Sequence, residues 1–179
     1  GVEEAMSAGM TTMAMVTSKY KQAIKNHFEP HADIKASTKG TAKEPLLDEV
    51  NYASEQCDFS YIEQDQMLGL GHAIYTGKPL IGNEPFAVIL PDDLCTSEGD
   101  SVLKQMTKLH TQHPDCCIVA IEQVPMTEVD KYGVIDGELL AGSNDAYRVN
   151  SMVEKPSLED APTNLAIIGR YILTPEIFD

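Results

Sequence analysis

The chain has 179 residues, of which 13 are basic and 28 acidic, so that its formal net charge is −15. Nucleic acid, itself a polyanion, would be repelled by this charge, and no apolar run approaches the roughly 20 residues that a membrane-spanning helix needs. Hydrophobic residues make up 42% of the chain, which excludes general disorder and is enough for one folded domain over residues 1–179.

Strands and helices alternate along the chain as far as residue 124. Apolar or β-favouring runs predict strands at residues 11–16, 59–62, 86–90 and 117–124. Helices are predicted at residues 18–28, 46–50, 71–77 and 99–110, with Pro79 beyond the third and an aperiodic loop over residues 29–43. This alternation predicts an α/β fold on a mostly parallel sheet, in which the wholly apolar run 86–90 is buried on both faces.

The pattern changes after residue 124. Three further strands are predicted at residues 132–136, 148–154 and 165–173, and no long helix separates them. Strands that follow one another without a crossover helix usually pair antiparallel. We therefore expect a small antiparallel extension at one side of the sheet.

The cysteines point to a reducing environment. Cys57, Cys95, Cys116 and Cys117 form no C-x-x-C pair, so neither a disulfide framework nor a zinc site is expected. Reduced thiols are typical of cytoplasmic proteins. Since Cys116 and Cys117 begin an apolar run, we expect them to pack as small hydrophobic side chains.

Both ends of the chain have the pattern of interrupted helices. Residues 2–9 have the pattern of the end of a helix that stops at Gly9. Thr174 and Pro175 have the residue types of a helix start, and only four residues follow them. These patterns predict a piece of a longer protein.

Two glycines stand directly before a predicted helix. Gly69 and Gly71 flank Leu70 and follow Gln64. Glycine lets a ligand approach the backbone closely, and the start of a helix supplies amide donors. The segment is therefore either a binding loop for a flat or anionic ligand or an ordinary turn.

Two adjacent carboxylates follow the apolar run 86–90. In α/β sheets ligands bind outside the carboxyl ends of the strands, where Asp92 and Asp93 are expected to lie. Carboxylates at such a place suit Mg²⁺, which binds oxygen ligands and phosphates. Helix capping or a solvated turn would explain the same pair.

A carboxylate and an ammonium group stand side by side at Glu154 and Lys155, at the end of another predicted strand. Neighbours in an extended chain point to opposite faces, so that one side chain can accept sugar hydroxyls while the other meets a phosphate. Such a pair is also common on solvated surfaces, and the dipeptide alone does not separate the two interpretations.

The motifs become specific when they are taken in order. The series is Gln64, Gly69-Leu70-Gly71-His72-Ala73-Ile74, Gly82-Asn83-Glu84-Pro85-Phe86-Ala87-Val88-Ile89-Leu90-Pro91-Asp92-Asp93, Tyr132-Gly133-Val134-Ile135-Asp136, Val153-Glu154-Lys155-Pro156 and Ala161-Pro162-Thr163-Asn164-Leu165-Ala166-Ile167-Ile168-Gly169-Arg170-Tyr171. It resembles the bacterial UTP–glucose-1-phosphate uridylyltransferases, also called UDP-glucose pyrophosphorylases. The resemblance runs nearly from end to end, with differences at residues 97–101 and 137–145.

This resemblance implies a fold and a reaction. The fold is the Rossmann-like nucleotidyltransferase fold, here incomplete at both ends, with a mostly parallel central sheet, helices on both faces and a small antiparallel extension. The reaction converts UTP and glucose 1-phosphate into UDP-glucose and pyrophosphate with Mg²⁺ as cofactor. The sugar phosphate oxygen attacks the α-phosphorus in line, and catalysis consists of positioning and charge neutralisation. A homo-oligomer is expected for the longer protein.

The resemblance also implies roles for individual residues. Gln64 would hydrogen-bond the uracil edge, and Gly69 would pack beside the base or ribose. Asp92 would hold Mg²⁺ and Asp93 would help to place the sugar. Asp92 and Lys155 are the expected catalytic residues, because they face the reacting phosphates.

The remaining implied roles concern the sugar. Lys155 would bind the sugar phosphate, Glu154 would accept glucose hydroxyls, and Gly133 would offer its backbone amide. Asn164 and the backbone near Ile167 would line the sugar pocket.

The family has parts that this chain lacks. It opens with a strand and a Gly-rich loop ending in Gly-Thr-Arg, followed by a Lys before Glu-Met-Leu-Pro, and these hold the triphosphate. We therefore expect the chain alone to be inactive. Loss of a central strand would leave two unpaired strand edges, so we also expect marginal stability, aggregation or pairing with another chain.

Two other functions are compatible with the sequence. The first is a non-catalytic sugar-nucleotide-binding remnant, which would have no Gly-rich loop upstream. The second is a related nucleotidylyltransferase with another base, such as a glucose-1-phosphate thymidylyltransferase. Binding of UDP-glucose and dTDP-glucose measured side by side would distinguish the bases.

Overall fold

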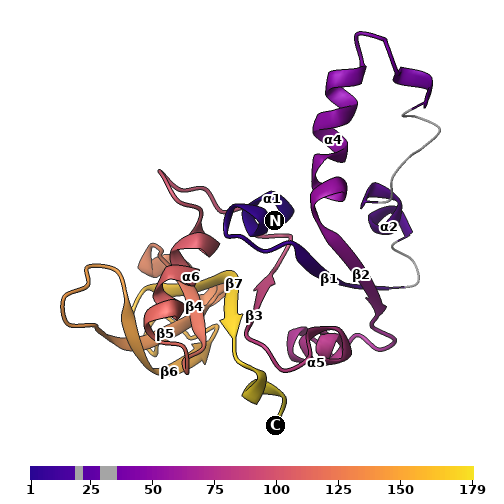
Figure 1. Ribbon diagram of the computed structural model, residues 1–179. Helices are drawn as coiled ribbons and strands as arrows, with labels where there is room; N and C mark the ends of the chain where they lie inside the picture. The colour runs from indigo at the N-terminus through magenta and orange to yellow at the C-terminus, as the bar shows by residue number, and fades with distance from the viewer. Residues whose placement is uncertain (19–21, 29–35) are drawn as a thin grey trace.

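Two sheets organise the chain in the computed structural model, which describes residues 1–18, 22–28 and 36–179 (Figure 1). The smaller sheet pairs β1 (Thr12–Thr17) with β2 (Asp58–Glu63) in parallel. The larger has the order β3-β7-β5-β6, and β4 also pairs with β7. Its strands are β3 (Phe86–Ile89), β4 (Ile118–Gln123), β5 (Gly133–Leu139), β6 (Tyr147–Glu154) and β7 (Leu165–Leu173).

Helices connect and cover these strands. The α-helices are α1 (Val2–Ser7), α2 (Gln22–Phe28), α4 (Glu44–Gln56), α5 (Leu70–Ile81) and α6 (Val102–Gln112), and two short 3₁₀ helices are η1 (Met126–Lys131) and η2 (Pro175–Phe178). Helix α5 packs against β1 and β2, and α6 against β4 and β7. In the part of the chain that the structure describes, no helix is long and apolar enough to cross a membrane.

The strand and helix positions predicted from the sequence are largely confirmed, with differences in extent. Helix α4 is longer than the predicted residues 46–50, and residues 36–38 of the predicted loop form a helical turn. Residues 19–21 of one predicted helix and residues 29–35 of the predicted loop lie outside the described residues.

Pro79 does not end α5, contrary to the prediction. The helix continues to Ile81, and the amide of Gly82 donates to the carbonyl of Lys78 at 3.3 Å. Proline lacks an N–H, so it removes one bond of the ladder. The missing bond is in the last turn of the helix. The next bond, from the Gly82 amide to the Lys78 carbonyl, is still made, so the helix continues past Pro79.

The predicted predominance of parallel pairing is wrong, although the α/β fold itself is confirmed. Among the described strands only β1 and β2 pair in parallel, and β3 pairs antiparallel with β7. Strand β4 is also antiparallel to β7. The apolar run 86–90 could not reveal this, because a strand with two covered faces looks the same in either direction.

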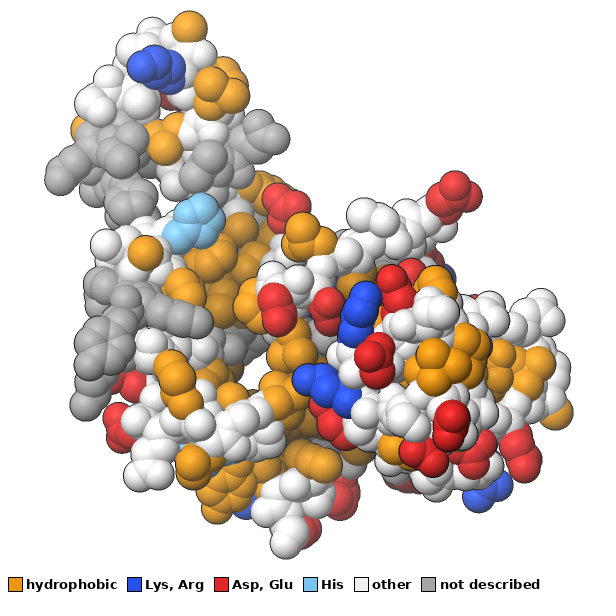
Figure 2. Space-filling model, turned by 180° about the vertical axis from the view of Figure 1, so that it is seen from behind, with side chains coloured by type: hydrophobic (Ala, Val, Ile, Leu, Met, Phe, Trp, Pro, Cys, Tyr) orange, Lys and Arg blue, Asp and Glu red, His pale blue; other side chains and the backbone are white. Residues whose placement is uncertain are grey.

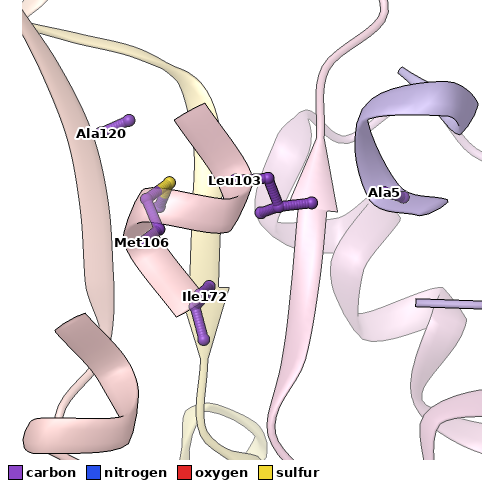
Figure 3. Close-up of a cluster of buried hydrophobic side chains, with 5 residues drawn as sticks. All are labelled: Ala5, Leu103, Met106, Ala120 and Ile172. Carbon is purple, nitrogen blue, oxygen red and sulfur yellow. The ribbon is translucent and has the colours of Figure 1, made fainter. Parts of the chain in front are cut away.

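The main core lies between α1, α6 and the larger sheet (Figure 3). It contains Ala5, Leu103, Met106, Ala120 and Ile172, and Leu103 is fully buried. Leucine and methionine at positions 103 and 106 of α6 lie one turn apart, so they present one apolar face to the strands. This core supports the strands whose ends carry the candidate site.

The two sheets leave strand edges open where they approach each other. In the described structure β1 bonds only to β2, and β3 only to β7. Met13 of β1 and Ile89 of β3 nevertheless pack against the same core. The molecule thus has two halves, one built on the smaller sheet and one on the larger sheet. Figure 2 shows hydrophobic side chains gathered in the recess between them.

Cys116 and Cys117 are exposed, so the expectation that they pack as buried hydrophobic residues is wrong. They lie in the connection from α6, before the first residue of β4. The Sγ atom of Cys117 lies 3.5 Å from the backbone nitrogen of Thr174, from which it accepts a weak hydrogen bond. All four cysteines are free.

Candidate functional site

Three of the predicted sugar residues meet at the ends of three strands. Gly133 begins β5 and lies opposite Glu154, the last residue of β6. A Cβ atom added to Gly133 would lie 3.1 Å from Oε2 of Glu154 and 3.3 Å from Cδ1 of Ile167 on β7. Glycine at this position therefore leaves a space bounded by a carboxylate on one side and an aliphatic side chain on the other.

Lys155 converges with Glu154, whereas the sequence predicted that the two side chains point to opposite faces. The φ angle of Lys155 is +47°, a left-handed conformation that breaks the alternation of an extended chain. Its Nζ atom lies 4.0 Å from Oε1 of Glu154, and both side chains are largely exposed, at 62% and 76%. A non-glycine residue in this conformation stores local strain, which is often found at functional sites.

The backbone at Lys155 is held by a hydrogen bond between strands. The Lys155 amide donates to the carbonyl of Tyr132 at 2.9 Å. Tyr132 directly precedes Gly133, so this bond joins the end of β6 to the start of β5. The two charged groups therefore extend from a fixed backbone into solvent.

The two aspartates form a turn at the end of β3, as predicted. Asp92 is exposed, and Asp93 is half-buried. The Oδ2 atom of Asp93 accepts the amide of Gly169 at 2.7 Å, and the carbonyl of Gly169 accepts the amide of Leu90 at 2.8 Å. The turn is therefore held against β7, and Asp92 is the carboxylate that is open to a ligand.

Tyr171, which the sequence analysis did not single out, lies close enough to Asp93 and Glu154 for both charges to affect its pKa. Burial raises the pKa of Tyr171, and the negative charges of Asp93 and Glu154 raise it further. Both carboxylates thus act on one phenol, which keeps its proton at neutral pH and can donate a hydrogen bond. The only sequence signal was its place at the end of the last motif.

The predicted base-binding residues lie apart from this group, in the loop between β2 and α5. Nε2 of Gln64 lies 2.9 Å from Nδ1 of His72 and donates to the carbonyl of Gly69 at 3.4 Å. Gly69 has a φ of +92°, which favours glycine, and it precedes the first residue of α5. His72, which was part of the motif but carried no role, therefore helps to orient the Gln64 amide.

Asn164 ties two strands together in this structure. Its Nδ2 atom donates to the carbonyl of Val124 at 2.8 Å, and its Oδ1 atom accepts from Nε2 of Gln123 at 3.4 Å. These bonds join the end of β4 to the start of β7. A role in lining the sugar pocket stays a prediction.

A separate cavity of about 550 Å³ lies between α6, β4 and the β5–β6 hairpin. Its lining includes Leu109, Cys116, Ile121, Ile135 and Tyr147. None of the residues predicted for the site lines it. This cavity is therefore not part of the candidate site.

The comparison with family models decides the family. The model described as nucleotidyl transferase matches residues 1–179. The chain belongs to the nucleotidyl transferase family.

Relatives of this nucleotidyl transferase chain agree with the resemblance that the motifs indicated. It is 54% identical over 179 residues to the UTP–glucose-1-phosphate uridylyltransferase of Pseudomonas aeruginosa, covering 99% of this chain and 63% of that protein. The chain thus spans less than two thirds of that relative's length.

Solved structures agree as well. A crystal structure of apo UDP-glucose pyrophosphorylase is similar with a TM-score of 0.93 and 56% identity, covering 99% of this chain and 64% of that chain. A UDP-glucose pyrophosphorylase complexed with UDP-glucose has a TM-score of 0.88 and 54% identity, covering 99% and 63%. The nucleotidyl transferase fold inferred from the motifs is therefore confirmed.

Proposed function

We propose that this chain is part of an enzyme that forms UDP-glucose and pyrophosphate from UTP and glucose 1-phosphate. The observation that carries the proposal is the meeting of Gly133, Glu154 and Ile167, with Lys155 beside Glu154. A similar protein has been solved with UDP-glucose, the product of this reaction. The strand ends of this chain present the groups that such a ligand requires.

The sugar would occupy the space above Gly133. The exposed carboxylate of Glu154 has free acceptor sites for glucose hydroxyls, and the phenol of Tyr171, whose pKa the charge of Glu154 helps to raise, would supply a donor. The ammonium group of Lys155 would attract the phosphate of glucose 1-phosphate. It would neutralise part of the phosphate charge while a phosphate oxygen attacks the α-phosphorus of UTP and pyrophosphate leaves. Gly133 would contribute its backbone amide, and Ile167 an apolar wall.

Mg²⁺ is the metal that we propose for the acidic turn. Among the described residues no group of three or more His, Cys, Asp or Glu side chains is arranged to hold a metal. A single exposed carboxylate at Asp92 nevertheless fits Mg²⁺, because this ion keeps several waters and binds through one or two carboxylates plus substrate phosphates. When bound, Mg²⁺ would neutralise charge on the phosphates.

The base would lie at the loop before α5. Gln64 would pair with the uracil edge, and Gly69 would allow the close approach of the base or ribose. Few contacts decide which base such a loop prefers. Two alternatives would use the same sugar-binding residues. One is a related nucleotidylyltransferase specific for another base, and the other is a non-catalytic remnant that binds the sugar nucleotide.

We propose that residues 1–179 form one partial nucleotidyltransferase domain and do not catalyse alone. The open edges of β1 and β3 and the apolar recess support a partial domain, because one more strand would complete a continuous sheet there. Groups that hold the triphosphate would come from outside this chain. The longer protein is proposed to be a homo-oligomer. It is also proposed to be cytoplasmic, which the four free thiols of this chain support.

Isothermal titration with UDP-glucose and Mg²⁺ tests the proposal on the purified chain. An Asp92→Asn, Glu154→Ala double variant should bind at least about tenfold more weakly, since charged hydrogen bonds contribute roughly 1.5–3 kcal/mol each. The matched control is Asp115→Asn, Glu159→Ala, which changes two exposed carboxylates outside the site. Parallel titration with dTDP-glucose reports the base preference.

Two results would contradict the proposal. One is equal binding by the double variant and the wild type. The other is the absence of binding by a wild-type chain that circular dichroism shows to be folded. Uridylyltransfer by the chain alone, above the level of the double variant, would contradict only the claim that it is inactive by itself.

A further inference from the structure

One arginine is buried directly beneath the acidic turn. The side chain of Arg170, on β7, is only 2% exposed. Its Nη1 atom donates to the carbonyl of Leu90 at 3.1 Å, and its Nη2 atom donates to the carbonyl of Asp93 at 2.9 Å. These two carbonyls bracket Pro91 and Asp92, so a single guanidinium group holds both ends of the turn.

The residue before Arg170 holds the same turn from the backbone. The Gly169 amide donates to Oδ2 of Asp93 and its carbonyl accepts the amide of Leu90, at 2.7 and 2.8 Å. A Cβ atom at position 169 would lie 2.6 Å from Cβ of Leu90 and 2.8 Å from Oδ2 of Asp93. The turn therefore packs against β7 at a distance that permits no side chain at this position.

Glu4 fixes the guanidinium group from the other side. Its Oε2 atom accepts Nε of Arg170 at 2.9 Å, and its Oε1 atom accepts the amide of Leu103 at 3.2 Å, at the start of α6. The carboxylate is only 12% exposed, so it balances the buried positive charge. Glu4 thus connects α1, α6 and β7 at one point below the turn.

We propose that Arg170, oriented by Glu4, is a positioning residue that holds the Leu90-Pro91-Asp92-Asp93 turn so that the open carboxylate, Asp92, faces the sugar phosphate and its metal. The inference rests on the function proposed above, since that function gives the turn its ligand. Arg170 touches neither ligand nor metal and acts through the backbone of the turn.

The chemistry of the guanidinium group explains why arginine occupies this position. Its planar fork donates from three nitrogens in fixed directions, which here reach a carboxylate and the carbonyls of residues 90, 93 and 169. Lysine keeps the charge but gathers its donors on one atom, so it cannot hold both ends of the turn. Arg170→Lys therefore removes the fork and leaves the charge balance of Glu4 intact.

Hydrogen–deuterium exchange measures the positioning without any ligand. The reporters are the amides of Leu90 and Gly169, which close the turn against β7, and the reference is the amide of Ala73 in α5. We expect Arg170→Lys to speed exchange at both reporters about tenfold and to leave Ala73 unchanged. Arg148→Lys, at the only other arginine of the chain, is the matched control and should change neither reporter.

Unchanged exchange at Leu90 and Gly169 in a folded Arg170→Lys variant would overturn the proposal. Equal acceleration at Ala73 would also overturn it, because the arginine would then stabilise the whole chain. If Arg170→Lys does not fold, Glu4→Gln applies the same test. Its amide has one acceptor oxygen for two donors, Nε of Arg170 and the Leu103 amide, and no charge to balance the guanidinium group, so faster exchange is expected at the same two reporter amides and not at Ala73.

Binding shows whether the positioning serves the ligand. Arg170→Lys should weaken UDP-glucose binding in the presence of Mg²⁺ about tenfold, and this loss should vanish in an Asp92→Asn background because both changes act on one turn. Additive losses would overturn the proposal. Absence of UDP-glucose binding by the folded wild type would overturn the proposed function instead, and the exchange result would still decide whether Arg170 holds the turn.

Discussion

The two halves of the molecule differ in how much apolar surface they bury. Of the described residues, every buried hydrophobic one except Ala5 and Cys57 lies between Leu103 and Leu173. In α4 of the other half, Leu46 and Tyr52 are 62% and 58% exposed. The half built on the larger sheet therefore buries more apolar side chains than the half built on the smaller sheet.

This difference separates the two parts of the proposed site. The sugar and phosphate residues stand on or beside the antiparallel strands of the half with the larger core, although β6 itself is mostly exposed. Gln64 and Gly69 stand on a loop of the thinly packed half. Regions with few buried apolar contacts open locally at low free-energy cost. We therefore expect the sugar side to be preformed and the base side to be more easily deformed.

The largest expected effect comes from truncating one leucine in each half. Leu103→Ala removes a fully buried side chain from the main core and should lower the free energy of unfolding by about 2–5 kcal/mol. Leu46→Ala, in the exposed part of α4, should change it by less than about 0.5 kcal/mol. Urea unfolding followed by circular dichroism compares the two, and equal losses would show that the halves are packed alike.

Two glycine substitutions compare the packing at the acidic turn with the packing at the loop before α5. Gly169→Ala should cost about 1–3 kcal/mol of unfolding free energy, because its Cβ would collide with Leu90 and Asp93. Gly71→Ala meets nothing within 4 Å and should stabilise α5 by up to about 1 kcal/mol. Thermal unfolding measures both. A stable Gly169→Ala variant would mean that the turn moves freely away from β7.

The smallest expected effect is a change in stability at alkaline pH. The pKa of Tyr171 is raised in the folded state, so the unfolded chain loses that proton first as the pH rises above about 10. The contribution of Tyr171 to stability is therefore complete below this pH and declines above it. Melting temperatures between pH 8 and pH 11 should fall less steeply for Tyr171→Phe than for wild type. Parallel profiles would show that the pKa of Tyr171 is not raised in the folded chain.

Much of the site could be predicted because its residues lie in local motifs at strand ends. Asp92, Asp93 and Lys155 come just after predicted strands, and Glu154 is the last residue of one. The pattern of these strands is readable from neighbouring residues alone. The order of these motifs also identified the family. Tyr171 and Arg170 were not singled out, because what gives them a role is a contact with residues far away in the chain.

The sequence by itself determined where the strands and helices lie, since hydrophobic patterning and turn residues act over a few positions. Only the tertiary structure decided that β3 and β4 run antiparallel to β7, because an apolar strand carries no mark of its direction. It also decided that Lys155 turns back toward Glu154, through a backbone angle that no local residue preference demands. The contact between Glu4 and Arg170 joins positions 166 residues apart, and such a contact exists only once the strands have packed.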